Sequence, residues 1–209
     1  MKKLILLGLI VFGGYKLYQH VSAPSDKWRV AADGTPIAQL FVGPGCEQYC
    51  SEMEEVLKGR NINYELIDVS TPEGAKYGVS GYPLTRVGKL AVSGNARNRL
   101  VGVLAEVYGN KVLTPGERIA MQDHFDDKGR PVVVLYGTQW CGYCKRQREY
   151  FADHNIAFSN VDVEASPSAK LAYDILQGGG YPLIYVGYRR FEGYKEQEVL
   201  DAVAELSRG

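Results

Sequence analysis

Residues 137–144 read Gly-Thr-Gln-Trp-Cys-Gly-Tyr-Cys, and they follow the apolar run Val-Val-Val-Leu-Tyr at 132–136. A charged stretch that is compatible with a helix begins at Lys145. This order predicts a strand, a loop with two cysteines in Cys-x-x-Cys spacing, and a helix. Cys141 then falls at a helix N-terminus, where partial positive charge favours the thiolate, and Cys144 lies one turn further on. The stretch therefore predicts a redox-active dithiol with Cys141 and Cys144 as the catalytic residues.

Basic residues come directly after the motif, and positive charge near a thiol lowers its pKa. They are Lys145, Arg146 and Arg148. Half of a zinc site is the other chemistry that two close cysteines suggest, but it needs two more ligands at metal spacing. The three histidines do not supply that spacing: His20, His124 and His154. We therefore expect no bound metal.

Length and composition restrict the function further. The chain has 209 residues, which suits one large domain or two small ones. Its 24 basic residues equal its 24 acidic residues, and no basic stripe interleaves with aromatics, so we expect no nucleic-acid partner. The four cysteines form two close pairs, whereas a secreted scaffold held together by disulfides has cysteines that close long loops. The two close pairs therefore indicate a chemical rather than a structural role for the cysteines.

Residues 1–23 are a predicted membrane anchor or signal segment. Lys2 and Lys3 precede an apolar run from Leu4 to Tyr15, which as a helix would be about 18 Å long, against a hydrocarbon core of about 30 Å. Extending the helix to Val21 nearly spans that core. We expect a single-pass anchor in the inner (cytoplasmic) membrane, with the globular part on the periplasmic or extracytoplasmic side.

A cleaved secretory signal is the alternative for this segment. Small residues suited to cleavage are present at Val21-Ser22-Ala23. Pro24 would directly follow that cut, a position that signal peptidases tolerate poorly, so we favour the uncleaved anchor.

The chain repeats itself. Leu-Phe-Val-Gly at 40–43 matches Val-Leu-Tyr-Gly at 134–137, and Gly-Tyr-Pro-Leu at 81–84 recurs at 180–183. The first match has an offset of 94 residues and the second an offset of 99, so the second copy contains five extra residues. Ordered self-similarity of this length indicates two copies of one fold.

Each copy is interpreted as a strand, the cysteine loop, a helix, a second strand, a helical stretch, a hairpin opened by Gly-Tyr-Pro-Leu, and a last helix. Strand-helix-strand requires a parallel pair with a right-handed crossover, and the hairpin adds antiparallel strands. We expect an α/β fold with two domains, at 37–108 and 131–207, each a four-stranded mixed sheet flanked by helices. Residues 109–130 contain turn sequences and are a predicted linker with one short helix.

This order of elements resembles the glutaredoxin branch of the thioredoxin superfamily, and the resemblance implies that both domains are thioredoxin-fold domains. The resemblance covers about residues 37–108 and 131–206, and each copy has the compact glutaredoxin length. It implies that the peptide bonds before Pro83 and Pro182 are cis. It also implies that the backbone at Pro182 pairs with an extended substrate beside Cys141.

The resemblance implies a thiol-disulfide oxidoreductase. Its substrate would be a disulfide-containing protein or a glutathione mixed disulfide, with glutathione as a possible co-substrate, no resident cofactor, and a redox protein as electron donor or acceptor. The expected substrate-binding residues are Trp140, Tyr143, Tyr181 and Pro182. The residues by which the family binds glutathione carboxylates are mostly missing here. Arg189 or Lys195 could substitute as a carboxylate partner, but both are interpreted mainly as solvated surface charges. The direction of electron flow does not follow from the sequence.

The first copy departs from this pattern. Glu47 stands at the position of Cys141, and Cys46 and Cys50 are four residues apart. The neighbouring residues are acidic, and negative charge raises the pKa of a thiol. Two hypotheses stay open for the Cys46 and Cys50 pair: a degenerate copy with a structural or substrate-positioning role, or a second redox pair.

Two other functions also stay open for the whole chain. Some glutaredoxins with similar active sites hold a [2Fe-2S] cluster between two protomers, using the first cysteine and glutathione. A redox-inert tandem fold that only binds a partner protein is the other possibility, and it fits the first copy better than the second.

Overall fold

The protein was analysed as a computed structural model, in which residues 29–206 are described. The first unit contains β1 (Ala38–Val42), α1 (Glu47–Gly59), β2 (Tyr64–Asp68), α2 (Pro72–Ala75), β3 (Leu84–Val87), β4 (Leu90–Ser93) and α3 (Arg97–Tyr108). The second unit contains β5 (Val133–Gly137), α5 (Gly142–Asp153), β6 (Phe158–Asp162), α6 (Pro167–Ile175), β7 (Leu183–Val186), β8 (Arg189–Glu192) and α7 (Gln197–Leu206). Between them lie η2 (Asn110–Val112), α4 (Pro115–Ala120) and η3 (Gln122–His124).

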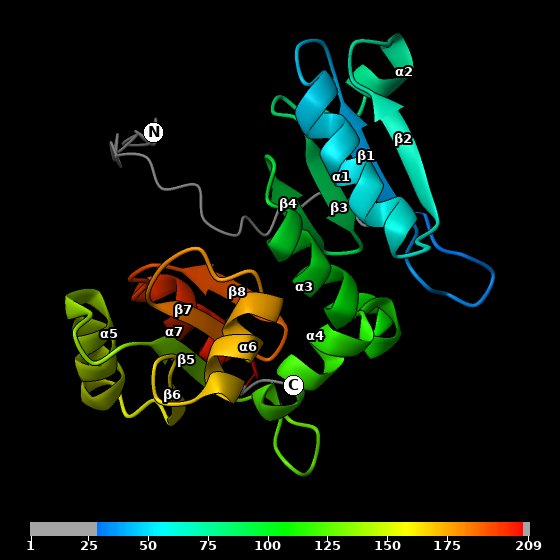
Figure 1. The fold of residues 1–209 in the computed structure, drawn as a ribbon. Helices are drawn as coiled ribbons and strands as arrows, with labels where there is room; N and C mark the ends of the chain where they lie inside the picture. Colours follow the sequence, from blue (N-terminus) through cyan, green and yellow to red (C-terminus); the bar gives the residue numbers. More distant parts are fainter. Residues whose placement is uncertain (1–28, 207–209) are drawn as a thin grey trace, which may run out of the picture.

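The two sheets have the same topology. Their strand orders are β2-β1-β3-β4 and β6-β5-β7-β8. In each, the first two strands in the chain are parallel, and the two remaining pairings are antiparallel. The tight hairpin turns use Gly88 and Gly187, whose φ angles of 58° and 59° favour glycine. The predicted pair of four-stranded mixed sheets is confirmed, and Figure 1 shows the two sheets in separate halves of the chain.

The two units differ in the helix before the proline hairpin. Helix α6 has nine residues, whereas its counterpart α2 has four. Both begin in the same way, because Thr71 and Ser166 cap them with a side-chain oxygen and a proline follows directly. The helix is thus five residues longer in the second copy, while the loop before it is one residue longer and the segment after it one residue shorter.

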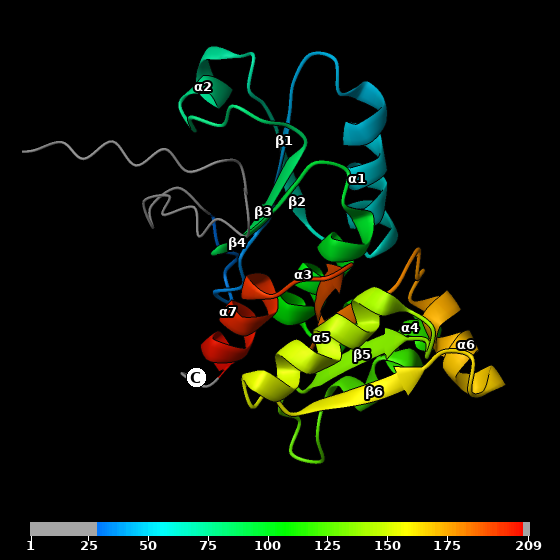
Figure 2. The ribbon, with the colours of Figure 1, turned by 90° about the vertical axis from the view of Figure 1, so that its left-hand side faces the viewer.

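One apolar core joins the units. A first cluster of buried side chains connects the inner faces of α1 and α3 with the segment 109–130 and with the α6 side of the second sheet. A second cluster lies between that sheet and helices α5 and α7. Figures 1 and 2 both show α3 between the two sheets. Because burial of apolar surface is the main favourable term in folding, we expect the units to support each other's stability.

Helix α3 also contacts the second unit through polar groups. Arg189 on β8 forms ion pairs with Glu106 on α3 (2.7 Å) and with Glu205 on α7. The Arg189 side chain is only 16% exposed, so its interpretation as a solvated surface charge is wrong. Its hydrogen bonds to Glu106 raise the pKa of Arg189 despite partial burial. Gly102 allows the close approach, because a Cβ there would lie 2.3 Å from the carbonyl oxygen of Tyr188.

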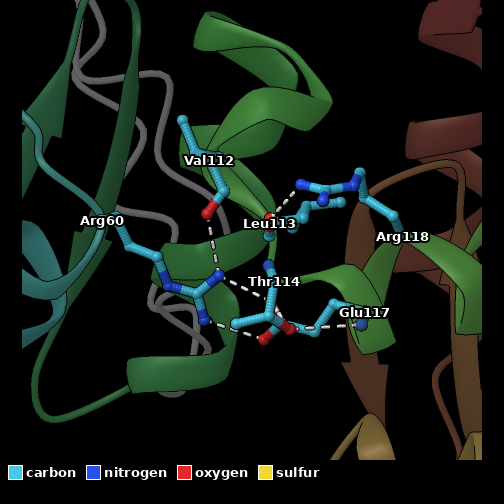
Figure 3. Close-up of polar contacts among 6 residues, drawn as sticks. All are labelled: Arg60, Val112, Leu113, Thr114, Glu117 and Arg118. Atoms are coloured by element: carbon cyan, nitrogen blue, oxygen red, sulfur yellow. Dashed lines mark hydrogen bonds and ion pairs between the residues drawn. The ribbon is translucent and has the colours of Figure 1, made fainter.

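An ion pair and hydrogen bonds of Arg60 hold the segment 109–130 against the first unit. Arg60, just after α1, donates two hydrogen bonds to the carboxylate of Glu117 (2.6 and 2.8 Å) and one to the carbonyl of Val112 (2.9 Å). Glu117 also completes a capping box with Thr114 at the start of α4. Figure 3 shows these groups converging, with Arg118 turned to the carbonyl of Leu113. Burial raises the pKa of Glu117, but the Arg60 and Thr114 hydrogen bonds outweigh it, so the net shift is downward.

The same segment reaches the second unit through His124. This side chain is completely buried. Its Nδ1 lies 3.1 Å from the carbonyl oxygen of Gly187, and its Nε2 lies 2.9 Å from the hydroxyl of Tyr136. Burial lowers the pKa of His124 to about 4, so the ring is neutral at physiological pH. The segment is thus fixed to both units.

Within residues 29–206, no helix combines the length and the apolar character needed to cross a membrane. The predicted anchor or signal segment at 1–23 lies outside the described residues.

Candidate active site

The Cys-x-x-Cys pair lies at the start of α5, as the sequence predicts. Cys141 is the N-cap residue, and its Sγ accepts a hydrogen bond from the backbone N–H of Cys144 at 3.0 Å. The two cysteines are joined in a disulfide with Cα atoms 5.2 Å apart. Cys144 is fully buried, and its Sγ occupies space that a side chain at Gly137 would need. Cys141 is 5% exposed, so of the two sulfurs it is the one nearer to solvent.

The register of the sheet brings the proline loop to the dithiol. Tyr136 at the end of β5 pairs with Leu183 at the start of β7. The loop that follows β5 and the residues that precede β7 therefore meet at one edge of the sheet. The peptide bond between Tyr181 and Pro182 is cis, as is the bond between Tyr82 and Pro83 in the first unit. Both cis bonds implied by the family resemblance are thus confirmed.

Exposed aromatic side chains flank the dithiol. Trp140 and Tyr143 are 69% and 60% exposed. The Trp140 ring meets the Tyr181 ring edge-on at 6.0 Å, and its indole N–H donates to both carboxylate oxygens of Glu164 (3.1 and 3.0 Å). The side chain is thus held in place although it faces solvent. Large apolar surface kept exposed beside a reactive group is typical of a binding face.

The remaining predicted residues fall as follows. Trp140 and Tyr181 touch each other, and Tyr143 lies inside the dithiol motif on α5. Pro182 is buried, and its carbonyl oxygen accepts the N–H of Gly193 (2.8 Å), which ties the β8–α7 loop to the proline. No group of three or more histidine, cysteine, aspartate or glutamate side chains in the range 29–206 is arranged to hold a metal ion.

Sequence reasoning missed Gln147. This glutamine is completely buried on α5 between the core residues Cys144 and Phe151. Its Oε1 accepts the N–H of Lys195 (2.9 Å), and its Nε2 donates to the carbonyl of the same residue (3.3 Å). A signal was present, because the self-alignment puts Met53 at this position in the first copy. A buried amide in place of an apolar side chain needs a polar partner.

The first unit presents a different helix start. Cys46 is the N-cap of α1 but accepts no side-chain hydrogen bond, and it forms a disulfide with Cys50. The Glu47 carboxylate instead accepts a hydrogen bond from the N–H of Gly45 (3.1 Å). Hydrogen bonds from its own N–H and from Gly45 lower the pKa of Glu47, so the carboxylate is ionised at neutral pH. A fixed negative charge thus lies next to Cys46.

The register of the first strand corrects the sequence match at that place. The carbonyl of Val42 accepts the N–H of Val69 as the carbonyl of Gly137 accepts that of Val163, so Gly137 corresponds to Val42 and not to Gly43. The ring of Tyr82 lies against Gly43, with the nearest ring atom 2.6 Å from an added Cβ, whereas the Cys144 sulfur lies against Gly137.

Residues 133–190 match the family model named Glutaredoxin. The second unit is thus similar to glutaredoxins. Two proteins from strains of Mycobacterium tuberculosis that carry glutaredoxin in their names are 34% identical to the chain over 47 residues, which is 22% of this chain and 56% of theirs. The chain therefore spans about half the length of the curated relatives it matches.

The chain also has low overall similarity to solved structures of glutaredoxins. A buckwheat glutaredoxin in complex with glutathione is 14% identical, with 44% of this chain and 94% of that chain covered and a TM-score of 0.36. The glutaredoxin of Archaeoglobus fulgidus is 25% identical, with 39% and 91% covered and a TM-score of 0.31. For this chain, the family match and the Cys-x-x-Cys pair support the general chemistry of thiol-disulfide exchange.

Proposed function

We propose that the chain is a thiol-disulfide oxidoreductase in which Cys141 is the nucleophile. The observation that carries this proposal is the position of its Sγ at the start of α5, where it accepts the N–H of Cys144. That hydrogen bond and the helix dipole both stabilise negative charge on the sulfur. Lys145, Arg146 and Arg148 add positive charge within the next two turns.

The exchange has two steps. The Cys141 thiolate attacks one sulfur of a substrate disulfide, a bond forms between them, and the other substrate sulfur leaves as a thiolate. Cys144 then loses its proton and attacks the Cys141 sulfur, which releases the second substrate thiol. The substrate gains two electrons and is reduced, and the Cys141–Cys144 disulfide is formed. The reverse sequence oxidises a substrate dithiol, and a partner redox protein or glutathione resets the enzyme.

Arg189 and Lys195, the two candidate partners for glutathione carboxylates, are both engaged in ion pairs within the chain. Arg189 is paired with Glu106 and Glu205, and Lys195 is paired with Glu198 at 2.9 Å. This supports protein disulfides as the main substrates, with glutathione mixed disulfides as a second class.

Turnover of two matched substrates tests the function. A disulfide between two peptides and a mixed disulfide of one of those peptides with glutathione are offered to the reduced chain. Cys141→Ser should abolish turnover of both. Cys144→Ser should accumulate a covalent complex with the peptide, because the mixed disulfide at Cys141 is no longer resolved internally. Full turnover by Cys141→Ser would contradict the proposal.

We further propose that residues 1–23 tether the chain to the inner membrane, with the globular part outside the cytoplasm. The support is the sequence alone: Lys2 and Lys3 before an apolar run. A reporter that is active only outside the cytoplasm, fused after Gly209, should give a signal. A signal from a cytoplasm-specific reporter only would overturn the orientation.

A further inference from the structure

The loop between β8 and α7 is tied to the dithiol face at two points. Gly193 donates its N–H to the carbonyl of Pro182, the cis-proline beside the dithiol. Two residues further on, the N–H and the carbonyl of Lys195 both bind the side-chain amide of Gln147. Because Gln147 lies three residues after Cys144 on the same helix, the amide fixes this loop against the helix that carries the dithiol.

A cation is held between two tyrosines at this place. The guanidinium of Arg146 lies 4.6 Å from the ring centre of Tyr194, which belongs to the loop, and 6.0 Å from that of Tyr143. The Tyr194 hydroxyl donates to the Glu196 carboxylate, which also holds the ring. Arg146 is exposed, and within the part of the chain that the structure describes it makes no ion pair with a carboxylate. A stacked guanidinium keeps its in-plane N–H donors free for a carboxylate.

The first unit provides an internal comparison. At the positions of Arg146, Gln147 and Tyr194 it has Glu52, Met53 and Asn95. Its glycine-to-proline hydrogen bond is retained at the same length of 2.8 Å. The pair of hydrogen bonds that Gln147 makes to the loop backbone is absent, because Met53 is apolar. Asn95 donates to the Glu52 carboxylate instead. The glycine-to-proline hydrogen bond is thus common to both units. The Gln147 hydrogen bonds to the loop and the stacked Arg146 guanidinium occur in the unit with the Cys-x-x-Cys pair.

We propose, on the basis of the thiol-disulfide exchange proposed above, that Gln147 is a positioning residue and Arg146 a substrate-binding residue. Gln147 holds the 193–196 loop so that Arg146, between Tyr143 and Tyr194, receives a carboxylate of the substrate near the attacked disulfide. The substrate class is a disulfide with a carboxylate close to its cysteine. An acidic side chain of a protein and a free carboxylate of glutathione are the two sources of that group.

A matched pair of peptide disulfides tests the subsite. The peptides differ only in carrying Glu or Gln beside the cysteine. Wild type should have a lower KM for the Glu peptide. Arg146→Gln should raise that KM about threefold to tenfold and remove the preference, as expected for one charge-assisted contact at a surface. Lys128→Gln removes an exposed cation far from the dithiol in sequence and should keep the preference.

Gln147→Met, which introduces the residue of the first unit, tests the positioning role. It should raise the KM for the Glu peptide about threefold while kcat and the pH dependence of Cys141 alkylation stay unchanged. A fall in kcat with KM unchanged would overturn the positioning role. If this variant does not fold, Tyr194→Asn takes its place, with the same expected rise in KM.

Binding without chemistry separates this inference from the proposed function. Peptides with Ser in place of Cys are titrated against the full chain carrying Trp28→Phe, so that the tryptophan fluorescence comes from Trp140. Tighter binding of the Glu peptide, weakened by Arg146→Gln, supports the subsite even if no turnover occurs. Equal binding of the Glu and Gln peptides overturns it. If Arg146→Gln also raises the KM of a glutathione mixed disulfide, glutathione supplies the carboxylate; if only the Glu peptide is affected, an acidic protein side chain does.

Discussion

The two helix starts that follow β1 and β5 occupy the same place in the same fold, yet different groups accept the backbone hydrogen bonds there. In α5 the sulfur of Cys141 accepts the N–H of Cys144. In α1 the Glu47 carboxylate accepts the N–H of Gly45, and the sulfur of Cys46 accepts no capping hydrogen bond. The Gly45 N–H lies just before α1, and the ionised Glu47 carboxylate next to Cys46 disfavours a thiolate there. The two loops thus differ in the conditions they offer for thiol chemistry, although the sheets have the same topology.

The shared apolar core gives the first unit a structural role that does not depend on thiol chemistry. Buried side chains of α1 and α3 belong to the same cluster as those on the α6 side of the second sheet. Arg189 and Glu106 add an ion pair across the units. We infer that the first unit supports the second mechanically, whatever its own cysteines do.

The largest expected effect is on turnover. Cys141→Ser should lower disulfide-exchange activity on the order of a thousandfold or more, because the attacking group is lost. The double variant Cys46→Ser/Cys50→Ser should keep turnover per folded molecule within about twofold of wild type. Steady-state rates, normalised to the folded fraction from circular dichroism, measure both. Comparable losses in the two variants would remove the asymmetry between the units.

The next effect is on stability. Arg60→Met should lower the free energy of unfolding by about 2 to 4 kcal/mol, because the Glu117 carboxylate then stays partly buried without its cation. Arg118→Met is the matched control, with an expected cost near 1 kcal/mol for one hydrogen bond to the Leu113 carbonyl. Chemical denaturation in a Trp28→Phe background, in which Trp140 is the remaining tryptophan and reports on the second unit, should show the Arg60 effect in full. An unchanged Trp140 transition would show that the units unfold independently.

A pH effect distinguishes the units as well. His124 is buried against the second sheet, and its carbonyl accepts the N–H of Val132. In the first unit the carbonyl of Arg29 accepts the N–H of Ile37 in the same way, but the Arg29 side chain is 74% exposed and paired with Glu65. The pKa of His124 is about 4 in the folded chain and 6.5 when unfolded, so the unfolded state binds the extra proton between these values. Stability is therefore intact above pH 6.5 and falls as pH drops to 4, by about 3 kcal/mol at about 1.4 kcal/mol per pH unit.

His124→Gln removes that titration and is the control for it. The variant is expected to be less stable at pH 7, but its stability should fall less between pH 6.5 and pH 4 than that of wild type. Urea denaturation at several pH values gives both slopes. Equal slopes would place the acid sensitivity in carboxylates that both proteins share.

The smallest effect is on the reactivity of Cys46. Glu47→Gln removes the ionised carboxylate at the start of α1, so alkylation of Cys46 in reduced protein near neutral pH should become about twofold to fivefold faster. Glu55→Gln changes an exposed charge further along the same helix and should have less effect. Mass spectrometry of the labelled peptides gives the rates. No change in the Glu47→Gln rate would remove the carboxylate as the cause of the difference.

The fold could be predicted from the sequence because motifs that are weak evidence alone occur in both copies. Gly-Tyr-Pro-Leu at 81–84 and 180–183 marked the two hairpins and both cis-prolines, and the strand before each cysteine loop was a clear apolar run. The position of Cys141 at the start of α5 followed from that order of elements.

Contacts between distant parts of the chain could not be predicted in the same way. Arg189 and Glu106 are 83 residues apart, and no periodicity marks them as partners. The interpretation of Arg189 as a surface charge failed because its burial depends on how the two units pack. Gln147 was missed for a related reason, since its partner is backbone at Lys195, which any residue type would provide.

The asymmetry between the two dithiols is tested most directly by competitive alkylation of the fully reduced wild-type chain. A thiolate-selective reagent is added near neutral pH, and the modification of each cysteine is followed over time. Cys141 should be labelled well before Cys46, Cys50 and Cys144, because it combines the α5 N-terminus, the hydrogen bond from Cys144 and the nearby basic residues. Earlier labelling of Cys46 would contradict the assignment of the chemistry to the second unit.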